Sequence, residues 1–446
     1  MKKQQWIVAI LATAAGVMIS NTANAQSSDA LLDKLVDKGV LTVKEANDLR
    51  AESDKNFTTA ISSKFGMPDW VTALKLNGDV RGRYENFSSD NRAFVERTRF
   101  RYRLRFGLTA QLMDNFEAGF KLTTADPTGS FGGNSLSGNS TMQDNGSKKF
   151  IYIDQVYAKW TPFKGPHLMG NFTFGKMESP FVLSDMVIDP DYTPEGIASQ
   201  MAYRFNDVHT LRLNGGAFVL DELSGTQKDP FLAGGQFRWD ANWSAKLQTT
   251  LGLAGLILAN EGSLTNSQVP NINRGNLHNL DGTLTYGYHA IVADASIIYL
   301  LDSAPFYTGA FPIKVGGDYM LNPEAPSSAD NYAYSVGVTF GKAGKRKTWE
   351  ASYTYKYLGA NSWWEELVDD DFGAFYAGNN SPPNSGFNIG YGGGTNVKGH
   401  VMRFAYSPTD SFTISAKWFL TELINQYPSG SKSDMSRLQV DAMWKF

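Results

Sequence analysis

The chain has 446 residues, of which 41 are Lys or Arg and 44 are Asp or Glu, and its formal net charge at pH 7 is -3. This slightly acidic balance argues against general affinity for nucleic acid, and the absence of cysteine excludes disulfides and thiolate metal sites. Aromatic residues make up 13% of the chain and 43 residues are glycine, a composition that favours a large all-β protein.

The N-terminus has the pattern of an export signal. Lys2-Lys3 precedes an apolar run from Trp6 to Ile19, and Ala23-Asn24-Ala25 matches an A-x-A cleavage site. The apolar run is shorter than the ~20 residues that a spanning helix needs. We therefore expect residues 1–25 to be a removed signal peptide and the exported protein to have no transmembrane helix.

Residues 26–70 are expected to form a short helical segment in the periplasm. Leu31, Leu32, Leu35 and Val36 fall on one helical face, and the stretch from Thr42 to Glu45 has the pattern of a capping box that opens a second helix. Two such short helices are too small to fold alone. The segment either associates with other copies or another envelope component, or it is a partly ordered extension.

Between Arg97 and Phe106, arginine occupies every odd position and a mostly apolar or aromatic residue every even one. A strand with this pattern has one cationic face and one apolar face. Burying unpaired guanidinium groups would exceed a domain's stability of roughly 5–15 kcal/mol, and each arginine placed in lipid at mid-depth would cost ~2–4 kcal/mol. One face must therefore meet water and the other an apolar medium, as in the wall of a transmembrane β-barrel.

Segments of alternating apolar and polar residues recur from about Val71 to the end of the chain, as expected of β-strands. They begin near Val71, Val95, Asn115, Phe150, His167, Ile197, His209, Phe231, Trp243, Leu280, Pro312, Asn331, Thr348, Val397, Ser411 and Met435. Short links alternate with mostly longer, Gly-, Ser-, Asn- and Asp-rich links, as in barrels with short periplasmic turns and long outer loops. Residues 71–446 are therefore predicted to form a 16-stranded antiparallel transmembrane β-barrel.

Two features leave the strand count open. The segment from Leu280 to Leu301 is a single strand only if a β-bulge near Ala290 accounts for the change of its apolar residues from even to odd positions. The long link from Gly359 to Asn396 has room for further strands, which would make an 18-stranded barrel.

The chain ends on Phe446, an aromatic residue that closes a clearly alternating strand. The link from Glu178 to Gly196, between the fifth and sixth predicted strands, is rich in proline and acidic residues. It contains the pattern Asp-x-Asp-x-x-x-Glu-Gly from Asp189 to Gly196. Together with the export signal, the short helical segment and the barrel, these features resemble the putative porin family of Gram-negative outer membranes.

The resemblance implies a place in the outer membrane of a Gram-negative bacterium, contact with outer-membrane lipid and a homotrimer. It also implies recognition of the C-terminal strand by the barrel-assembly machinery, and a third outer loop that folds into the barrel and narrows the pore. The candidate acids of such a constriction are Glu178, Asp185, Asp189, Asp191 and Glu195.

Arginines on the lumen face of the first two strands supply the opposite charge. They are Arg81, Arg83, Arg97, Arg99, Arg101, Arg103 and Arg105. Alternate residues of a strand lie about 6.8 Å apart, and an acidic loop folded against the arginines would offset their mutual repulsion. The transverse field across the lumen would then filter solutes by size and charge. Alternatively, the arginines pair only with acids of the wall, such as Asp79, Glu85 and Glu117.

Enzymatic barrels are the main rival class, because they need a nucleophile or paired acids near a histidine. The five histidines show no recognisable spacing with Ser or Asp, so we assign no catalytic residue. The run from Asp369 to Asp371 fits either a divalent-cation site or an acidic loop, and we assign no metal. Trp363-Trp364 fits either stacking on a sugar ring or a place at the membrane interface.

The sequence thus predicts an outer-membrane porin, a passive diffusion channel for small hydrophilic solutes and ions, with neither enzymatic activity nor a cofactor. One alternative is a channel selective for a sugar, a phosphate or an anionic polysaccharide. The other is an outer-membrane hydrolase.

Overall fold

The computed structural model describes residues 68–127, 136–225, 228–264, 274–379, 382–385 and 389–446. The expected signal peptide and nearly all of the expected helical segment fall in residues 1–67, outside this described part. The chain divides into two units, Met1–Ala73 and Leu74–Phe446, and the second unit is the barrel. Among the described residues, no helix has both the length and the apolar character that crossing a bilayer requires.

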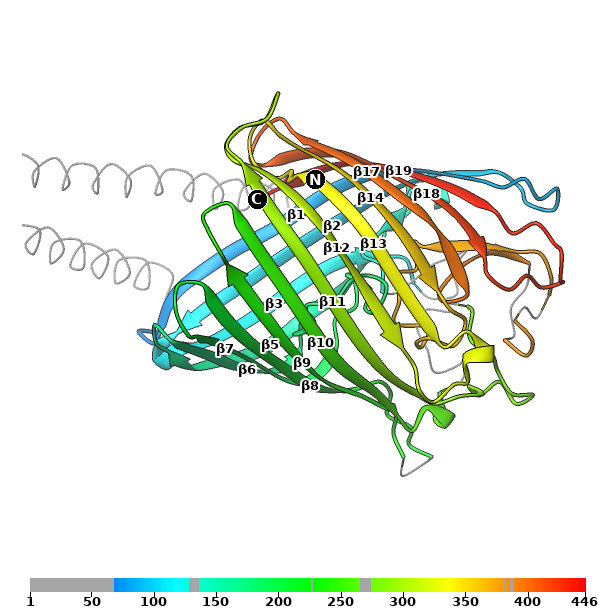
Figure 1. Cartoon of the computed structure of the whole chain (residues 1–446), viewed down its shortest axis with the longest axis horizontal. Coiled ribbons are helices and arrows are strands. Elements are labelled where there is room, and N and C mark those ends of the chain that lie inside the picture. Colours follow the sequence, from blue (N-terminus) through cyan, green and yellow to red (C-terminus); the bar gives the residue numbers. More distant parts are fainter. Residues whose placement is uncertain (1–67, 128–135, 226–227, 265–273, 380–381, 386–388) are drawn as a thin grey trace, which may run out of the picture. The chain divides into compact units, whose positions relative to one another are not determined.

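Sixteen antiparallel strands form the wall of the barrel (Figure 1). They are β1 (Val71–Ser88), β2 (Arg97–Leu112), β3 (Phe116–Ala125), β5 (Phe150–Lys164), β6 (Leu168–Lys176), β7 (Glu195–Arg204), β8 (His209–Val219), β9 (Phe231–Asn242), β10 (Leu247–Ala259), β11 (Tyr288–Leu301), β12 (Phe311–Leu321), β13 (Tyr332–Gly341), β14 (Thr348–Leu358), β17 (Val397–Ser407), β18 (Phe412–Leu423) and β19 (Met435–Lys445). The predicted 16-stranded barrel is confirmed, and most strands begin within two residues of the predicted positions.

The barrel closes where its first and last strands pair. β1 and β19 are antiparallel neighbours, with Asp79 opposite Lys445 at one end and Ser88 opposite Ser436 at the other. The remaining wall strands each pair with the next one along the chain. In a closed barrel, the backbone N–H and C=O groups of every strand can hydrogen-bond to a neighbouring strand. Strands in a membrane require this, because lipid offers them no partners.

Outside the wall, the regular elements among the described residues are short. β4 (Ser140–Thr141) pairs with β2, and β15 (Gly373–Tyr376) pairs with β16 (Gly390–Gly393) as a separate hairpin. Four single turns of 3-10 helix are η1 (Met113–Asn115), η2 (Asp144–Gly146), η3 (Glu261–Ser263) and η4 (Ser327–Ala329).

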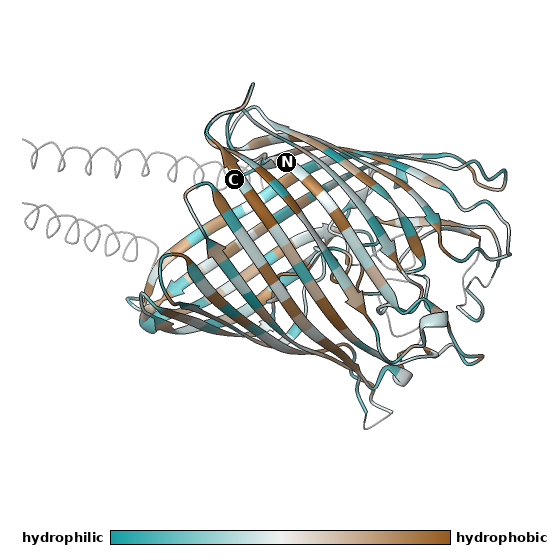
Figure 2. Cartoon of the chain, in the orientation of Figure 1, coloured by the Kyte–Doolittle hydropathy of each residue, from teal (hydrophilic) through white to brown (hydrophobic). Residues whose placement is uncertain are grey.

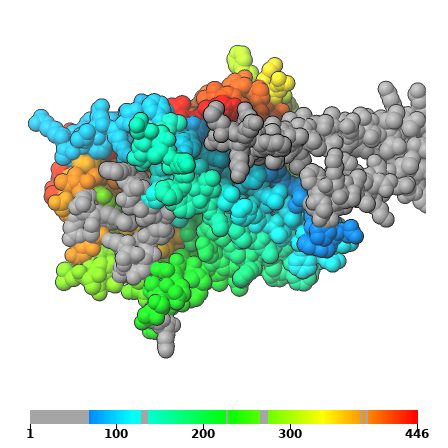
Figure 3. Space-filling view, turned by 180° about the vertical axis from the view of Figure 1, so that it is seen from behind, coloured from blue at the N-terminus to red at the C-terminus, as the bar shows by residue number. Residues whose placement is uncertain are grey.

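The alternation of side chains along β2 is the one that the sequence predicts. The apolar residues Phe100 and Leu104 are exposed on the outside, with 54% and 37% of their surface accessible. Arg101 and Arg103 point into the barrel and are buried, with 4% and 6% accessible. Figure 2 shows brown and teal positions alternating along the strands, and Figure 3 shows the outer surface of the first half of the barrel from the other side.

Two expectations about the strand count are wrong. The link from Gly359 to Asn396 holds the β15–β16 hairpin, but this hairpin is not part of the wall, so the alternative of 18 strands fails. No bulge occurs near Ala290, because β11 begins at Tyr288 and pairs with β10 in an unbroken register. The even-numbered residues Leu284 and Tyr288 are apolar because they are buried in the interior cluster, not because they face lipid.

Two long loops fill much of the interior: loop 3 (residues 177–194, between β6 and β7) and loop 7 (residues 359–396, between β14 and β17). Val187 of loop 3 and Trp363 of loop 7 are fully buried in one cluster. The indole Nε1 of Trp363 donates a hydrogen bond to the Val187 carbonyl oxygen at 3.0 Å. The loops therefore pack on each other as well as on the wall.

The seam between β1 and β19 gives a test of the fold. Gly78 exchanges backbone hydrogen bonds with Phe446, and a Cβ at Gly78 would lie 2.3 Å from the Arg105 carbonyl oxygen and 2.5 Å from the Phe446 ring. We expect Gly78→Val to cost about 1–3 kcal/mol by overpacking, and so to lower the temperature at which the folded band is lost on heat-modifiable gel electrophoresis. Gly82→Val is the matched control, since nothing lies within 4 Å of a Cβ there. If both variants lowered this temperature equally, the prediction would be contradicted.

Candidate functional site

Two arginines of β2, Arg99 and Arg103, donate hydrogen bonds to acids of the barrel wall, and Arg101 donates to a residue just before β4. Arg99 Nε donates to Glu85 at 2.5 Å, and Arg103 donates to Asp79 at 2.7 and 3.0 Å. Arg101 Nη2 donates to the Asn139 carbonyl oxygen at 3.2 Å. Two of the wall acids, Asp79 and Glu85, thus lie against arginines of β2.

Two further residues that were candidates for such pairs, Glu117 and Arg97, do not pair, in the described part of the chain, with each other or with the other members of the set. Glu117, the third wall acid, pairs with Lys159 at 3.0 Å and not with an arginine of β2. Arg97 lies exposed at the start of β2, and no ion pair engages it among the described residues.

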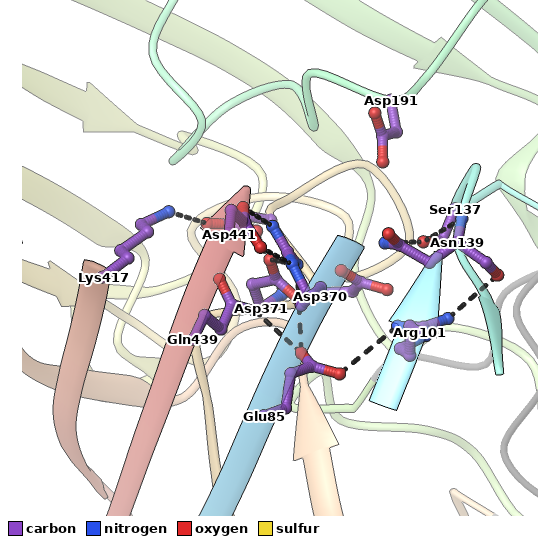
Figure 4. A network of polar contacts seen from close by, with 12 residues as sticks. Glu85, Arg101, Ser137, Asn139, Asp191, Asp370, Asp371, Lys417, Gln439 and Asp441 are labelled. Carbon is purple, nitrogen blue, oxygen red and sulfur yellow. Dashed lines mark hydrogen bonds and ion pairs between the residues drawn. The ribbon is translucent and has the colours of Figure 1, made fainter. Parts of the chain in front are cut away.

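The arginines of β1 are tied to the last strand and to loop 7. Arg83 donates two hydrogen bonds to Asp441 of β19, at 2.7 and 2.8 Å, and its Nη1 lies 3.4 Å from Asp371. Arg81 donates to Asn139 at 2.6 Å and lies 3.8 Å from Asp441. Carboxylates from β1, β19 and loop 7 gather at this point (Figure 4).

Glu85 is the centre of this network. Its side chain is fully buried and lies within ion-pair distance of Arg83, Arg99, Arg101 and Arg437. Arg437 is 2% exposed, and its Nη2 bridges Glu85 at 2.7 Å and Asp371 at 2.5 Å. A buried carboxylate among several guanidinium groups is stable only because the opposite charges compensate its loss of water.

Loop 3 reaches the arginine ladder, which is the row of arginines along β2 from Arg97 to Arg105, through a single acid. Asp191 accepts a hydrogen bond from Arg105 and lies 4.0 Å from Arg103. Although burial opposes ionisation, the guanidinium groups of Arg105 and Arg103 lower the pKa of Asp191. Of the five candidate acids, Asp191 is thus the one that lies against Arg103 and Arg105.

The other candidate acids of the loop 3 region face different partners. Asp185 pairs with Lys356 of β14 at 2.5 Å. Glu178 is 78% exposed and lies 3.7 Å from Lys121. Glu195 is the first residue of β7, where it pairs with Lys176 at 3.0 Å in a largely exposed setting. The set is thus spread over both sides of the loop and does not form one acidic ring.

Asp189 lies where loop 3 meets loop 7. Its carboxylate accepts hydrogen bonds from the amides of Asp191 and Asp370, and one ligand atom each from Asp189, Asp369 and Asp370 lies within 4.8 Å of the others. Burial and the neighbouring carboxylates raise the pKa of Asp369 to about 6 and of Asp370 to about 7, and raise that of Asp189 well above its usual value. The junction therefore disfavours full ionisation of its acids.

The place of loop 7 inside the barrel was not predicted from the sequence. Trp363 and Trp364 neither lie at a membrane interface nor face an open binding surface: both are buried in the cluster that includes loop 3. The run from Asp369 to Asp371 is also ordered, with Asp369 N donating to the Asp185 carbonyl oxygen at 3.0 Å. The sequence does contain a sign that loop 7 is buried, because a loop exposed to water does not need the large apolar side chains that this loop carries. These are Trp363, Trp364, Leu367, Val368, Phe372 and Phe375.

Loop 3 divides the remaining space of the lumen. A chamber of about 430 Å3 lies between residues 182–185 of the loop and the inner face of β9, β11, β12, β13, β14, β17 and β18. Two smaller cavities, of about 280 and 260 Å3, lie on the side of the loop toward β2, β3 and β5. Polar and charged side chains dominate the lining of all three.

Comparison with known proteins agrees with the resemblance seen in the sequence. Residues 93–268 match the model of a family described as putative porin. No curated protein sequence is significantly similar to the chain. The family match and the closed barrel together support an outer-membrane channel.

Several solved structures are similar to the chain at low identity. OprB of Pseudomonas putida is 9% identical, with 87% of this chain and 97% of that chain covered and a TM-score of 0.47. OmpF of Salmonella typhi, solved in complex with daunomycin, is 10% identical, with coverages of 84% and 97% and a TM-score of 0.46. OmpT of Vibrio cholerae, solved with its loop L8 deleted, is 9% identical, with coverages of 84% and 99% and a TM-score of 0.43.

The buried network predicts a large stability effect for Arg437. Replacing it with glutamine leaves the buried Glu85 and the partly buried Asp371 without their shared cation. We therefore expect Arg437→Gln to lower the free energy of unfolding by about 3–5 kcal/mol. Urea unfolding in lipid vesicles, followed by tryptophan fluorescence, measures this change. Lys246→Gln breaks an exposed pair with Asp302 and should cost at most about 1 kcal/mol; similar costs for both variants would refute the buried-network assignment.

The loop junction predicts a pH dependence. Since the folded protein raises the pKa of Asp369 and Asp370, it binds more protons than the unfolded chain between about pH 4 and 7. Lowering the pH from 8 to 5.5 should therefore stabilise the contact between loops 3 and 7. Hydrogen exchange of loop 7 peptides, corrected for intrinsic rates, should be slower at pH 5.5.

The groups that face this junction are Asp185, Asp189 and Asp191 of loop 3, Asp371 of loop 7, Lys356 of β14, Lys417 of β18 and Arg437 of β19. Asp370→Asn removes one of the titrating carboxyls and should flatten the pH dependence. Protection that stays constant between pH 8 and 5.5 in the unmodified protein would show that the junction does not titrate in this range.

Proposed function

We propose that this protein is an outer-membrane porin, a passive diffusion channel for small hydrophilic solutes and ions, with neither catalytic activity nor a cofactor. The observation that carries the proposal is the polar space left beside loop 3 inside a closed barrel, including the chamber of about 430 Å3. A lumen lined by charged and hydroxyl side chains admits hydrated solutes, while the apolar outer face requires lipid.

The proposal places the barrel in the outer membrane of a Gram-negative bacterium. Its outer face contacts outer-membrane lipid, the C-terminal strand ending at Phe446 is read by the barrel-assembly machinery, and the assembled form is a homotrimer. The family match over residues 93–268 supports this setting.

The proposed constriction is the level at which loop 3 crosses the lumen. At this level Asp191 joins loop 3 to Arg103 and Arg105 on one side, and Asp185 joins it to Lys356 on the other. Loop 3 is thereby held against both walls, and permeating solutes must pass beside it. Size exclusion by the loop and the charges along its edges then set which solutes pass.

The absence of cysteine from the chain allows a direct test, since any introduced cysteine is the only one. Thr339 of β13 lines the chamber. In planar bilayers, Thr339→Cys should form stable open channels whose conductance falls after reaction with a charged, membrane-impermeant thiol reagent, because the added group occupies the solute path.

Val336→Cys is the matched control on the same strand, since Val336 faces outward with 53% of its surface exposed. It should form channels whose conductance the reagent leaves unchanged. A protein without conductance that hydrolyses lipid or peptide would refute the proposal in favour of an outer-membrane hydrolase. Open currents that one solute class blocks saturably would favour a substrate-selective channel.

A further inference from the structure

The chamber beside loop 3 has a cationic lining. Three carboxylates face it, from Asp185, Asp294 and Asp318. Five cationic side chains face it, from Arg238, Lys314, Lys356, Arg403 and Lys417. The distribution of partners among these groups decides which charge a passing solute meets.

Four of the five cations are already engaged. Arg238 Nη1 donates to both carboxylate oxygens of Asp294, at 2.9 and 3.0 Å. Lys356 pairs with Asp185 at 2.5 Å, Arg403 pairs with Glu350, and Lys417 lies 3.7 Å from Asp369. Within each pair the two opposite charges largely cancel, so the four pairs leave little net electric field in the chamber.

The Arg238–Asp294 pair is held in place by the backbone between them. Both residues lie opposite Gly252 of β10 in the strand register. A Cβ at Gly252 would lie 2.0 Å from Asp294 Oδ1 and 2.9 Å from Arg238 Nη1. The pair therefore occupies the space over this glycine and is not free to turn toward a solute.

Asp318 is covered by donors that carry no charge. Its Oδ2 accepts hydrogen bonds from the hydroxyl groups of Ser184 at 2.6 Å and Ser335 at 2.9 Å. Ser184 belongs to loop 3, so this acid helps to hold the loop against β12 and β13. The two hydroxyl donors leave the carboxylate its negative charge, but they hold it against loop 3 and β13, where Asp318 is partly buried, whereas Lys314 on the same strand is exposed.

Lys314 is the exception among the cations. Its side chain is exposed on the inner face of β12, and among the described residues no hydrogen bond or ion pair engages it. The acid whose charge it lies near, Asp294, is held by Arg238. Thr339 lies directly opposite Lys314 in the β12–β13 register and also lines the chamber, so the two side chains project from neighbouring positions of the wall into the same space.

The arginine ladder cannot play this part, because its central members are not open to the lumen. Arg101 and Arg103 are 4% and 6% exposed, and their charges are matched by Glu85, Asp79, Asp126 and Asp191. The ladder therefore holds loops and wall together, while an unneutralised charge remains on the opposite side of loop 3.

We propose that solutes pass on the side of loop 3 away from the arginine ladder, and that Lys314, with the Thr339 hydroxyl beside it, makes this path selective for small anions such as carboxylates. This inference rests on the proposed channel function and assigns its solute class. The ammonium group attracts the anion and the hydroxyl donates a hydrogen bond to it, while the neutralised pairs around them define the width of the path.

Reversal potentials in a KCl gradient across planar bilayers test the inference. We expect the unmodified protein to prefer chloride over potassium, and Lys314→Gln to lower that permeability ratio by about threefold, the effect of one charge acting over several ångströms in water. Lys314→Arg should retain the ratio. Lys345→Gln removes a lysine from the turn between β13 and β14, away from the chamber, and should match the unmodified protein.

A conducting channel that prefers potassium, or whose ratio is unaltered in Lys314→Gln, would overturn the inference while leaving the channel function intact. A protein without any conductance would refute the channel function itself.

A cysteine on each side of loop 3 tests the path directly. Thr109 lines one of the smaller cavities on the ladder side. A negatively charged thiol reagent should lower the conductance of Thr339→Cys more than that of Thr109→Cys. The reverse order would place the solute path beside the ladder and overturn the inference.

Discussion

The interior of this barrel depends on the pairing of guanidinium groups that have lost contact with bulk water. Once loops cover the inner face of β1, β2 and β19, each arginine there needs a carboxylate or a carbonyl within reach, since an isolated buried charge is far too costly. Glu85 meets this need for several arginines at once, and Asp371 and Asp441 complete the network. The position of loop 7 follows from the same requirement, because Asp371 is one of its residues.

Loops 3 and 7 support each other inside the barrel. Their contact combines apolar packing around Trp363 and Val187 with backbone hydrogen bonds, including one from Asp189 N to the Leu367 carbonyl oxygen at 2.7 Å. Neither loop contains enough regular structure to hold its shape alone, since the β15–β16 hairpin has only four residues in each strand. The wall and the partner loop together determine each conformation.

This arrangement makes the lumen asymmetric. On the ladder side, Arg99, Arg103 and Arg105 are held in ion pairs with nearby carboxylates, and the cavities are small. On the side of β11 to β14, short side chains such as Ser296, Ser335 and Thr354 leave a wider polar space. The arginines of β2, which dominate the charge pattern of the sequence, are therefore not the charged groups that a solute in the chamber would meet.

The wall could be predicted from the sequence almost residue by residue, because period-2 alternation is a local property and the two solvents on either side of a barrel strand enforce it. The bulge expected near Ala290 was wrong for the same reason. Tyr288 is apolar because it packs in the interior cluster, and alternation alone cannot distinguish an apolar interior from lipid. What only the tertiary structure decided is which acid meets which arginine. Asp191 reaches the ladder while Asp185 and Asp189 do not, and within the described part of the chain no ion pair engages Lys314. Such pairings join residues far apart in the chain and depend on the path of the two loops through the lumen. The sequence alone determined the barrel and its two faces; the packed loops decided where charge remains open to a solute.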